Sequence, residues 1–535
     1  MLVVWSKRER IDLKMIATII LLIIFFAVMI GVGVYCRKNA TDVNGFVLAG
    51  RSVGPWLTAF AFGTSYFSAV IFVGYAGQFG WNFGLSSTWI GLGNAFIGSL
   101  LAWSILGRRT RIMTQHLDSK TMPDFFGSRY SSPALKIFAS IIVFVFLIPY
   151  TASLYNGLSS LFNIAFAVPY WACIVIMAVL TGLYVIFGGY MATAINDFIQ
   201  GVVMLFGIVI VIASVLISKG GFMQAMADLS QIQADGTQMN GAFTAFLGPD
   251  PLSLLFVVIL TSLGTWGLPQ MVGKFYSIKS EDSVRKGTII STFFAIIVAG
   301  GCYFLGGFGR LFTPETTAEG KILFDTVVPS MLKDLNPIVI GIVIVLVLSA
   351  SMSTLSSLVL TSSSTLTLDV IVPKRKKETS EKTTVLIMRL FIVFFIIISA
   401  IIAIVKDSKP GLTFIAQMMG VSWGALAGAF LAPFLYGLYW KRTTKASAFV
   451  CFIYGTVLMI FQMYVSLAGV KFVNPFMAYM FNNSIRSGVL AMVGGLVIVP
   501  IVSLFTKAPD KQMVENAFLC YNKEVVTVAK DSLGE

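Results

Sequence analysis

Hydroxyl side chains cluster in one stretch of the second half of the sequence, residues 350–357 (ASMSTLSS). In a helix, Ala350, Ser353, Thr354 and Ser357 would share one face, because residues three and four apart are neighbours there. A single hydroxyl in an apolar helix often only bonds the carbonyl four residues earlier. Several together favour a site for a monovalent cation, because uncharged oxygens bind such an ion and still release it quickly.

The main acidic residue within an apolar segment is Asp197, in residues 194–200 (AINDFIQ). A charge inside a membrane costs about 2.5–3.5 kcal/mol on insertion scales, so such a residue is a functional candidate. Its place near the start of the segment leaves an interfacial role open. The chain has one histidine and five cysteines, without metal-binding spacing or a cluster suited to catalysis. We therefore expect no enzyme.

Long apolar runs make up most of the chain and would position these residues. Of the 535 residues, 57% are hydrophobic and 12% are charged, about half the charged fraction of a soluble domain. About 20 apolar residues cross a ~30 Å hydrocarbon core as a helix. About thirteen such segments are expected, at residues 15–35, 54–79, 86–106, 135–165, 169–187, 190–217, 251–273, 287–309, 337–371, 385–405, 411–440, 446–467 and 487–506.

Two of these segments contain helix-breaking residues. Residues 63–65 (GTS) interrupt the second segment, and Gly264, Gly267 and Pro269 interrupt the seventh. The two segments are five apart, and interrupted helices at matching places in two halves are typical of the binding centre of an inverted-repeat transporter. Unwound backbone at such breaks frees carbonyls for cations and amides for anionic groups.

The distribution of the net charge of +14 along the chain indicates how the protein is oriented in the membrane. In a soluble protein this excess would suggest nucleic acid, but here we expect no such partner, because Lys and Arg are enriched in cytoplasmic loops. The basic loops follow odd-numbered segments, with Arg108, Arg109, Arg111, Lys120, Arg129, Lys274, Lys279, Arg285, Lys286, Lys374, Arg375, Lys376, Lys377, Lys441, Arg442 and Lys445. This pattern predicts a multi-pass protein of the plasma (cytoplasmic) membrane with its N-terminus outside and its C-terminus in the cytoplasm.

Five motifs occur in order along the chain. They are residues 48–55 (LAGRSVGP), 121–129 (TMPDFFGSR), 188–201 (GGYMATAINDFIQG), 350–357 (ASMSTLSS) and 437–442 (GLYWKR). With these motifs the chain resembles the sodium/solute symporter family, in its proline and pantothenate branch, over nearly its whole length. The resemblance implies an all-α polytopic membrane protein with the LeuT-type fold, in which five plus five helices form an inverted repeat.

The family fold implies one transmembrane domain with six parts. These are an N-terminal tail (1–14), an extra N-terminal helix (15–35), the first repeat (54–217), the second repeat (251–440), two C-terminal helices (446–506) and a cytoplasmic tail (507–535).

The resemblance also implies sodium-binding residues. The primary site would use the backbone carbonyls of Thr64, Phe67 and Ala350 with the hydroxyls of Ser353 and Thr354. A second sodium ion, which some relatives bind, would use Asp197, Ser353, Thr354, Ser356 and Ser357. Na+ would then be the co-transported ion, with one or two ions per cycle.

The solute is expected to be a small organic molecule such as pantothenate, an amino acid or another carboxylate. Proline carriers of the family have an aspartate where Tyr66 stands, which argues against proline, whereas pantothenate carriers have a tyrosine there. The expected solute contacts, each of which could equally serve helix packing, are Ser68, Gln78, Thr265, Trp266 and Gln417.

Other functions remain open at this point. A proton-coupled carrier of the same fold would use Asp197 as its proton site. A channel would not need the paired breaks, and a membrane sensor without transport would normally carry a soluble signalling domain. A lipid bilayer surrounds the protein in every case. One chain holds both pseudo-repeats, so we expect a monomer to function.

Overall fold

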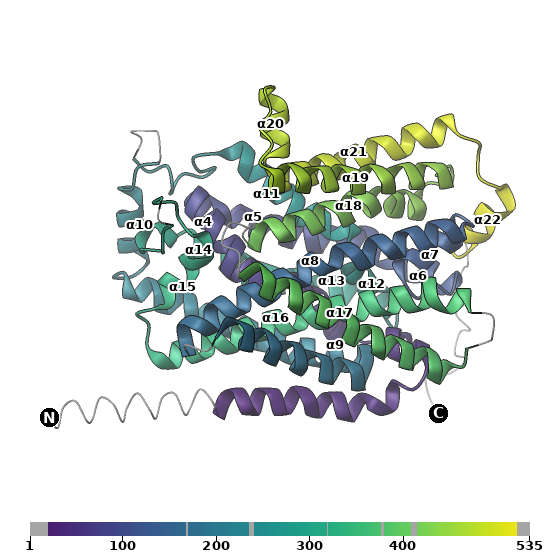
Figure 1. The fold of residues 1–535 in the computed structure, drawn as a ribbon, viewed down its shortest axis with the longest axis horizontal. Helices are drawn as coiled ribbons and strands as arrows, with labels where there is room; N and C mark the ends of the chain where they lie inside the picture. The colour runs from purple at the N-terminus through teal and green to yellow at the C-terminus, as the bar shows by residue number, and fades with distance from the viewer. Residues whose placement is uncertain are drawn as a thin grey trace, which may run out of the picture.

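The computed structural model describes residues 20–166, 169–234, 240–317, 319–375, 379–407 and 415–521. Within these ranges the chain forms helices and loops, with two isolated backbone bridges, Val53 to Ile278 and Thr316 to Ile322. Most long helices lie side by side along one direction (Figure 1). The expected N-terminal tail (1–14) lies outside the described residues, as does the end of the expected C-terminal tail.

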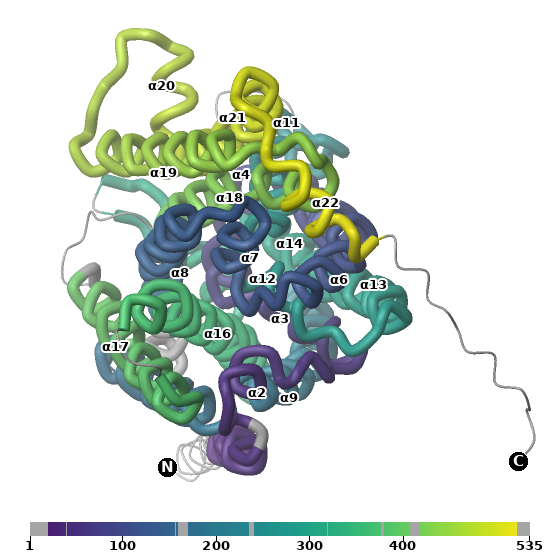
Figure 2. Tube along the Cα trace, turned by 90° about the vertical axis from the view of Figure 1, so that its right-hand side faces the viewer, coloured from purple at the N-terminus to yellow at the C-terminus, as the bar shows by residue number. Residues whose placement is uncertain are grey.

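The long helices follow the expected apolar segments, and short helices lie in the connections between them and after the last one. They are Ile20–Cys36, α2 (Val43–Leu48), α3 (Pro55–Tyr66), α4 (Ala76–Phe83), α5 (Thr88–Gly93), α6 (Arg108–His116), α7 (Met122–Arg129), α8 (Pro133–Phe166), α9 (Tyr170–Ser218), α10 (Phe222–Ser230), α11 (Pro251–Leu263), α12 (Pro269–Tyr276), α13 (Glu281–Ala295), α14 (Gly301–Gly306), α15 (Val327–Leu332), α16 (Pro337–Thr365), α17 (Glu381–Asp407), α18 (Ile415–Tyr439), α19 (Lys445–Ala468), α20 (Pro475–Phe481), α21 (Ser484–Phe505) and α22 (Lys511–Leu519). Viewed along the helices, α3 and α12 lie inside the bundle, and α8, α9, α13, α16 and α18 lie around them (Figure 2).

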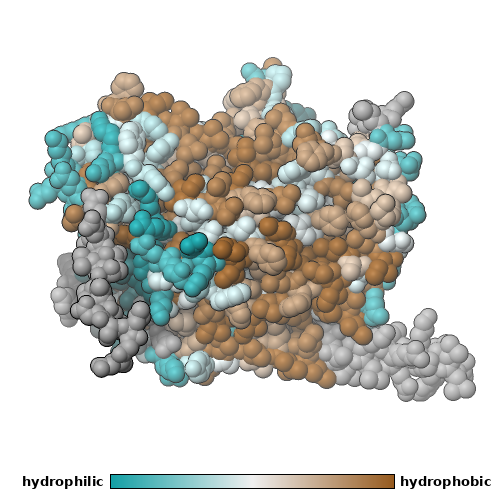
Figure 3. All heavy atoms as spheres, turned by 180° about the vertical axis from the view of Figure 1, so that it is seen from behind, coloured by the Kyte–Doolittle hydropathy of each residue, from teal (hydrophilic) through white to brown (hydrophobic). Residues whose placement is uncertain are grey.

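The surface of the bundle is that of a membrane protein. Hydrophobic side chains cover the middle of one face, and hydrophilic side chains gather toward its ends (Figure 3). Among the described residues, nine helices are long and apolar enough to cross a membrane, or ten if the bent pair α11 and α12 forms one span. The all-helical fold class is confirmed, whereas the total of about thirteen spans stays a prediction.

Two of those nine helices are more than twice as long as one crossing needs. Tyr170–Ser218 has 49 residues and Val70–His116 has 47, whereas about 20 residues suffice for a ~30 Å core. Each is interrupted by a glycine outside the helical region, Gly189 (φ 54°, ψ −148°) and Gly84 (φ 61°, ψ −140°). Both glycines fall between segments that the sequence analysis separated.

Both of the segments expected to be broken are broken, but the first break lies at Phe67 and Ser68, whereas the expected position, residues 63–65, is helical. Helix α3 ends at Tyr66, and Phe67 takes an extended conformation (φ −85°, ψ 123°) before helical structure resumes at Val70. Helix α11 passes through one 3₁₀ turn, Gly264–Gly267, and then bends by 45° into α12. Gly267 permits close packing on α18, because a Cβ there would lie 2.9 Å from Cα of Ala427. The breaks therefore bring unwound backbone into the centre of the bundle.

Candidate functional site

Five oxygens from two helices meet at the break after α3. Oγ1 of Thr354 lies within hydrogen-bond distance of three carbonyl oxygens, those of Thr64 and Phe67 at 3.3 Å each and that of Ala350 at 3.1 Å. Oγ of Ser353 lies 3.2 Å from the carbonyl of Thr64 and 3.0 Å from that of Ala350. We call this group of five oxygens the cradle. It contains the whole expected primary sodium set.

The local fold explains why these oxygens converge. The extended conformation of Phe67 ends the helical hydrogen-bond pattern and turns carbonyls at the end of α3 toward α16. On α16, Ser353 and Thr354 follow Ala350 by three and four residues, so all three lie on the face toward α3. Gly201 of α9 lets α3 pack closely there, since a Cβ at this position would lie 2.3 Å from the Phe60 ring.

The cradle has the chemistry of a site for a hard monovalent cation. Its oxygens are three carbonyls and two hydroxyls, all uncharged, and all five residues are buried. Hard oxygen ligands about 2.4 Å from a cation lie about 3.4 Å from one another in an octahedral shell. The separations of 3.0–3.3 Å in the cradle are close to that value, so small shifts would admit an ion.

One helical turn from the cradle, a buried lysine bridges three helices. Nζ of Lys274 on α12 lies 3.5 Å from Oδ2 of Asp197 on α9 and donates a hydrogen bond to Oγ of Ser357 on α16 at 2.9 Å. The side chain of Lys274 is 2% exposed and that of Asp197 is 0% exposed. Oγ of Ser357 lies 2.8 Å from Oγ of Ser65, the neighbour of Thr64.

The assignment of Lys274 to a cytoplasmic loop is therefore wrong. The sequence analysis placed it there because it directly follows an apolar run, where basic residues usually mark a loop. In the structure the bend between α11 and α12 continues the helix past that run, and Lys274 points into the bundle. A buried charge requires a partner of opposite sign, and Asp197 supplies it.

The expected second sodium set is only partly brought together. Ser353 and Thr354 belong to the cradle, whereas Oγ of Ser356 bonds the carbonyl of Ser353 in its own helix at 2.9 Å. Asp197 and Ser357 both face Lys274. The part of this set outside the cradle thus surrounds an ammonium group.

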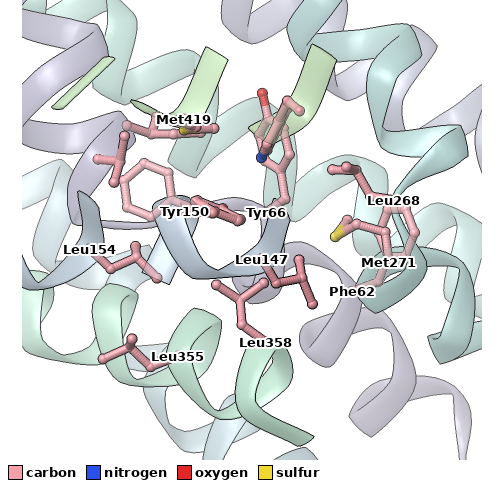
Figure 4. Packing of buried hydrophobic residues seen from close by; sticks show 14 of the residues in the cluster. Phe62, Tyr66, Leu147, Tyr150, Leu154, Leu268, Met271, Leu355, Leu358 and Met419 are labelled. Carbon is pink, nitrogen blue, oxygen red and sulfur yellow. The ribbon is translucent and has the colours of Figure 1, made fainter. Parts of the chain in front are cut away.

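Aromatic residues lie on the other side of the α3 break, near Ser68. The rings of Tyr66 and Tyr150 lie 5.8 Å and 6.0 Å from the ring of Trp423 on α18. Figure 4 shows Tyr66, Tyr150 and Met419 in this buried region. Ser68 is buried, and its hydroxyl lies close to that of Tyr150. This group of rings and hydroxyls is the best candidate for solute contact, and the sequence analysis gave only Ser68 of it as a solute contact.

The other expected solute-contact residues lie on several different elements. Thr265 bonds the carbonyls of Ser262 and Gly98, and Nε1 of Trp266 donates to the carbonyl of Ile97 at 3.0 Å. These polar atoms therefore tie the second break to the neighbouring helical segment Asn94–Leu101 (η5). Two further candidates, which are partly buried, are Gln78 on α4 and Gln417 on α18.

A cavity of about 50 Å³, lined by both polar and apolar residues, reaches the buried lysine. Lys274, Ser357 and Tyr190 line its inner part, and Lys120 and Thr121 come from the loop before α7. The cavity therefore connects the region of the Lys274–Asp197 pair with the end of the bundle that carries α6, α7 and α22 (Figure 1).

A helical bundle with two broken helices, and with five uncharged oxygens converging at one break, has the arrangement expected of a sodium-coupled solute carrier of the LeuT-type fold. The model of the sodium:solute symporter family matches residues 46–455. The chain belongs to this family. It is accordingly a carrier with Na+ as the co-transported ion, and not an enzyme.

Comparisons with individual proteins agree with this result. The chain is 31% identical to the sodium/proline symporter of Staphylococcus aureus (strain JH9) over 83% of this chain and 85% of that protein. It is 28% identical to the osmoregulated proline transporter OpuE of Bacillus subtilis (strain 168), over 93% and 96% of the two chains.

Solved structures agree on the fold. A Na+-coupled sialic acid symporter in a substrate-bound outward-open state superposes with a TM-score of 0.70 at 17% identity, over 92% of this chain and 99% of that one. A manganese transporter of Eremococcus coleocola gives a TM-score of 0.51 at 14% identity, over 84% and 95%.

Proposed function

We propose that the cradle binds the sodium ion that drives uptake, and that the solute is a small carboxylate of amino-acid size, with proline the first candidate. The observation that carries this proposal is the convergence of five uncharged oxygens between the unwound end of α3 and the hydroxyl face of α16. A sodium ion there would hold the two helices together. It would thereby shape the neighbouring solute region around Ser68.

The aromatic residues near Ser68 support a solute of this kind. The rings of Tyr66, Tyr150 and Trp423 offer apolar faces to a small aliphatic ring, and ring faces also attract an ammonium group. Tyr66 stands where proline carriers of the family have an aspartate, so an amino group would here be bound by ring faces and backbone carbonyls. The pantothenate expectation receives no support from the two proline-carrying relatives.

Alternating access would use the cavity beside Lys274 as the inward route. The basic residues Lys120, Arg108 and Arg111 lie at that end of the bundle, which supports its assignment to the cytoplasmic side. In the outward-facing state, sodium and solute bind from outside. After the core rocks inward, both leave through this cavity, and loss of sodium weakens solute binding because the coupling between two ligands is reciprocal.

One sodium ion supplies enough energy for accumulation. A charge that crosses ~100 mV contributes about 2.3 kcal/mol, and a tenfold sodium gradient adds about 1.4 kcal/mol. The sum of about 3.7 kcal/mol supports a several-hundredfold gradient of a neutral solute.

The test is uptake into proteoliposomes that contain the purified protein. Radiolabelled proline, other amino acids, pantothenate and monocarboxylates are compared with an inward sodium gradient and with potassium in its place. We expect sodium-dependent accumulation of an amino acid, lost when a sodium ionophore is added. Uptake of pantothenate alone would refute the solute class. Uptake that follows a proton gradient without sodium would refute the role of the cradle.

A further inference from the structure

The Lys274 ammonium occupies the place where the sequence leads one to expect a second cation. Its Nζ lies 3.5 Å from the Asp197 carboxylate and 2.9 Å from Oγ of Ser357, which are two of the expected second-site residues outside the cradle. Both side chains of the ion pair are almost completely buried. An ion bound to the same two oxygens would have to stand beside this ammonium.

The hydrogen-bond directions at Ser357 also indicate that the Lys274 ammonium occupies the expected second cation site. The hydroxyl of Ser65 donates to the carbonyl of Ala61 at 2.6 Å, so the hydroxyl of Ser357 is the donor in the 2.8 Å contact with Ser65. The oxygen of Ser357 then accepts the hydrogen bond from Lys274. Its hydrogen is directed toward Ser65 and its oxygen toward an ammonium group, so this ligand is already engaged by a cation.

Electrostatic repulsion opposes the binding of a sodium ion at Asp197 and Ser357 while the Lys274 ammonium is there. Two unit positive charges about 4 Å apart repel strongly even at an effective dielectric constant of about 20, which disfavours the second ion by about three orders of magnitude. The carboxylate of Asp197 can balance one positive charge. With Lys274 in place, a sodium ion at Asp197 would leave a buried site with one net positive charge.

We propose that Lys274 serves as a built-in cation at the Asp197–Ser357 site, so that the carrier binds one sodium ion per cycle, at the cradle. This inference rests on the proposed function, because it takes the cradle as the sodium site. The tethered ammonium keeps Asp197 neutralised throughout the cycle without crossing the membrane. It also joins α12, α9, α16 and, through Ser357, α3, next to the inward cavity.

The test counts sodium ions on the purified full-length protein by equilibrium binding of ²²Na+, and it needs no solute. We expect one ion per chain for the wild type and for Lys274→Arg, which keeps the positive charge. Lys274→Met should raise the count to two, because Asp197 and Ser357 become free. The double variant Lys274→Met/Asp197→Asn should return it to one.

The possible outcomes distinguish a failure of this inference from a failure of the proposed function. Two ions on the wild type would overturn the built-in cation and leave sodium-coupled transport standing. Folded Lys274→Met protein that still binds one ion would overturn it as well. No sodium binding by the wild type at any concentration would overturn the cradle itself. If Lys274→Met does not fold, Lys274→Gln, which also removes the positive charge, replaces it in the count, and two ions on the wild type would overturn the inference without any variant.

Discussion

Removal of the Ser353 hydroxyl is the sharpest perturbation of the cradle. Ser353→Ala deletes one of five oxygens and leaves the helix intact, because alanine is the best helix former. The oxygen lies 3.2 Å from the carbonyl of Thr64 and 3.0 Å from that of Ala350, so it is a direct neighbour of two further ligands. The variant therefore changes ion coordination at one point.

The expected loss follows from the energy of one contact to a charged group. A hydrogen bond or equivalent polar contact to a charge is worth about 1.5–3 kcal/mol net, and each 1.4 kcal/mol is a factor of ten. We therefore expect sodium affinity to fall by about 10- to 150-fold. Solute uptake should recover at sodium concentrations raised by the same factor, because the remaining four oxygens still form the site.

The assay is equilibrium ²²Na+ binding together with the sodium dependence of uptake. Ser351→Ala is the matched control, since Ser351 lies on the same helix, is equally buried, and donates a hydrogen bond to the carbonyl of Val347 in its own helix at 2.8 Å. The control should stay within threefold of the wild type. Equal effects of the two variants, or no effect of Ser353→Ala, would refute the assignment of the cradle.

Three further predictions concern the solute region, helix packing and orientation. Trp423→Ala should raise the solute KM at least tenfold in uptake assays and leave ²²Na+ binding by the solute-free carrier within threefold, because the ring lies beside Tyr66 and not in the cradle; an equal loss of sodium binding would contradict this. Gly80→Ala should destabilise the purified protein by about 1–3 kcal/mol in thermal unfolding, because a Cβ there would clash with the carbonyl of Gly306, whereas Gly300→Ala meets nothing within 4 Å and should change little. The five native cysteines are buried, so Val473→Cys should react with an impermeant maleimide in intact cells and Lys511→Cys only after permeabilisation; the reverse pattern would invert the orientation.

The sequence predicted the second break and the hydroxyl face of α16, and placed the first break a few residues too early, because these features depend mainly on local properties. Glycine, proline and the 3.6-residue period act within one segment. The partnership of Thr354 with Phe67 spans 287 positions, and only the family resemblance indicated it. No property of either segment alone specifies which carbonyl faces which hydroxyl.

The buried lysine was missed for a physical reason. Lys274 directly follows an apolar run, and sequence composition treats a basic residue at that place as a loop residue. Its direction depends on the 45° bend between α11 and α12 and on a partner in α9, 77 positions earlier. The orientation of Thr265 and Trp266 likewise depends on a 3₁₀ turn beside η5, and residue type does not reveal which way such side chains point.

The most direct test of the central claim is the equilibrium accumulation ratio of the transported solute in proteoliposomes, measured while sodium gradient and membrane potential are varied independently. For one sodium ion and a neutral solute, the ratio should change about tenfold for each tenfold step in sodium gradient and for each ~60 mV of potential. A hundredfold change per tenfold step would mean two sodium ions and would contradict the role of Lys274. A ratio that ignores sodium and follows the proton gradient would contradict sodium coupling at the cradle.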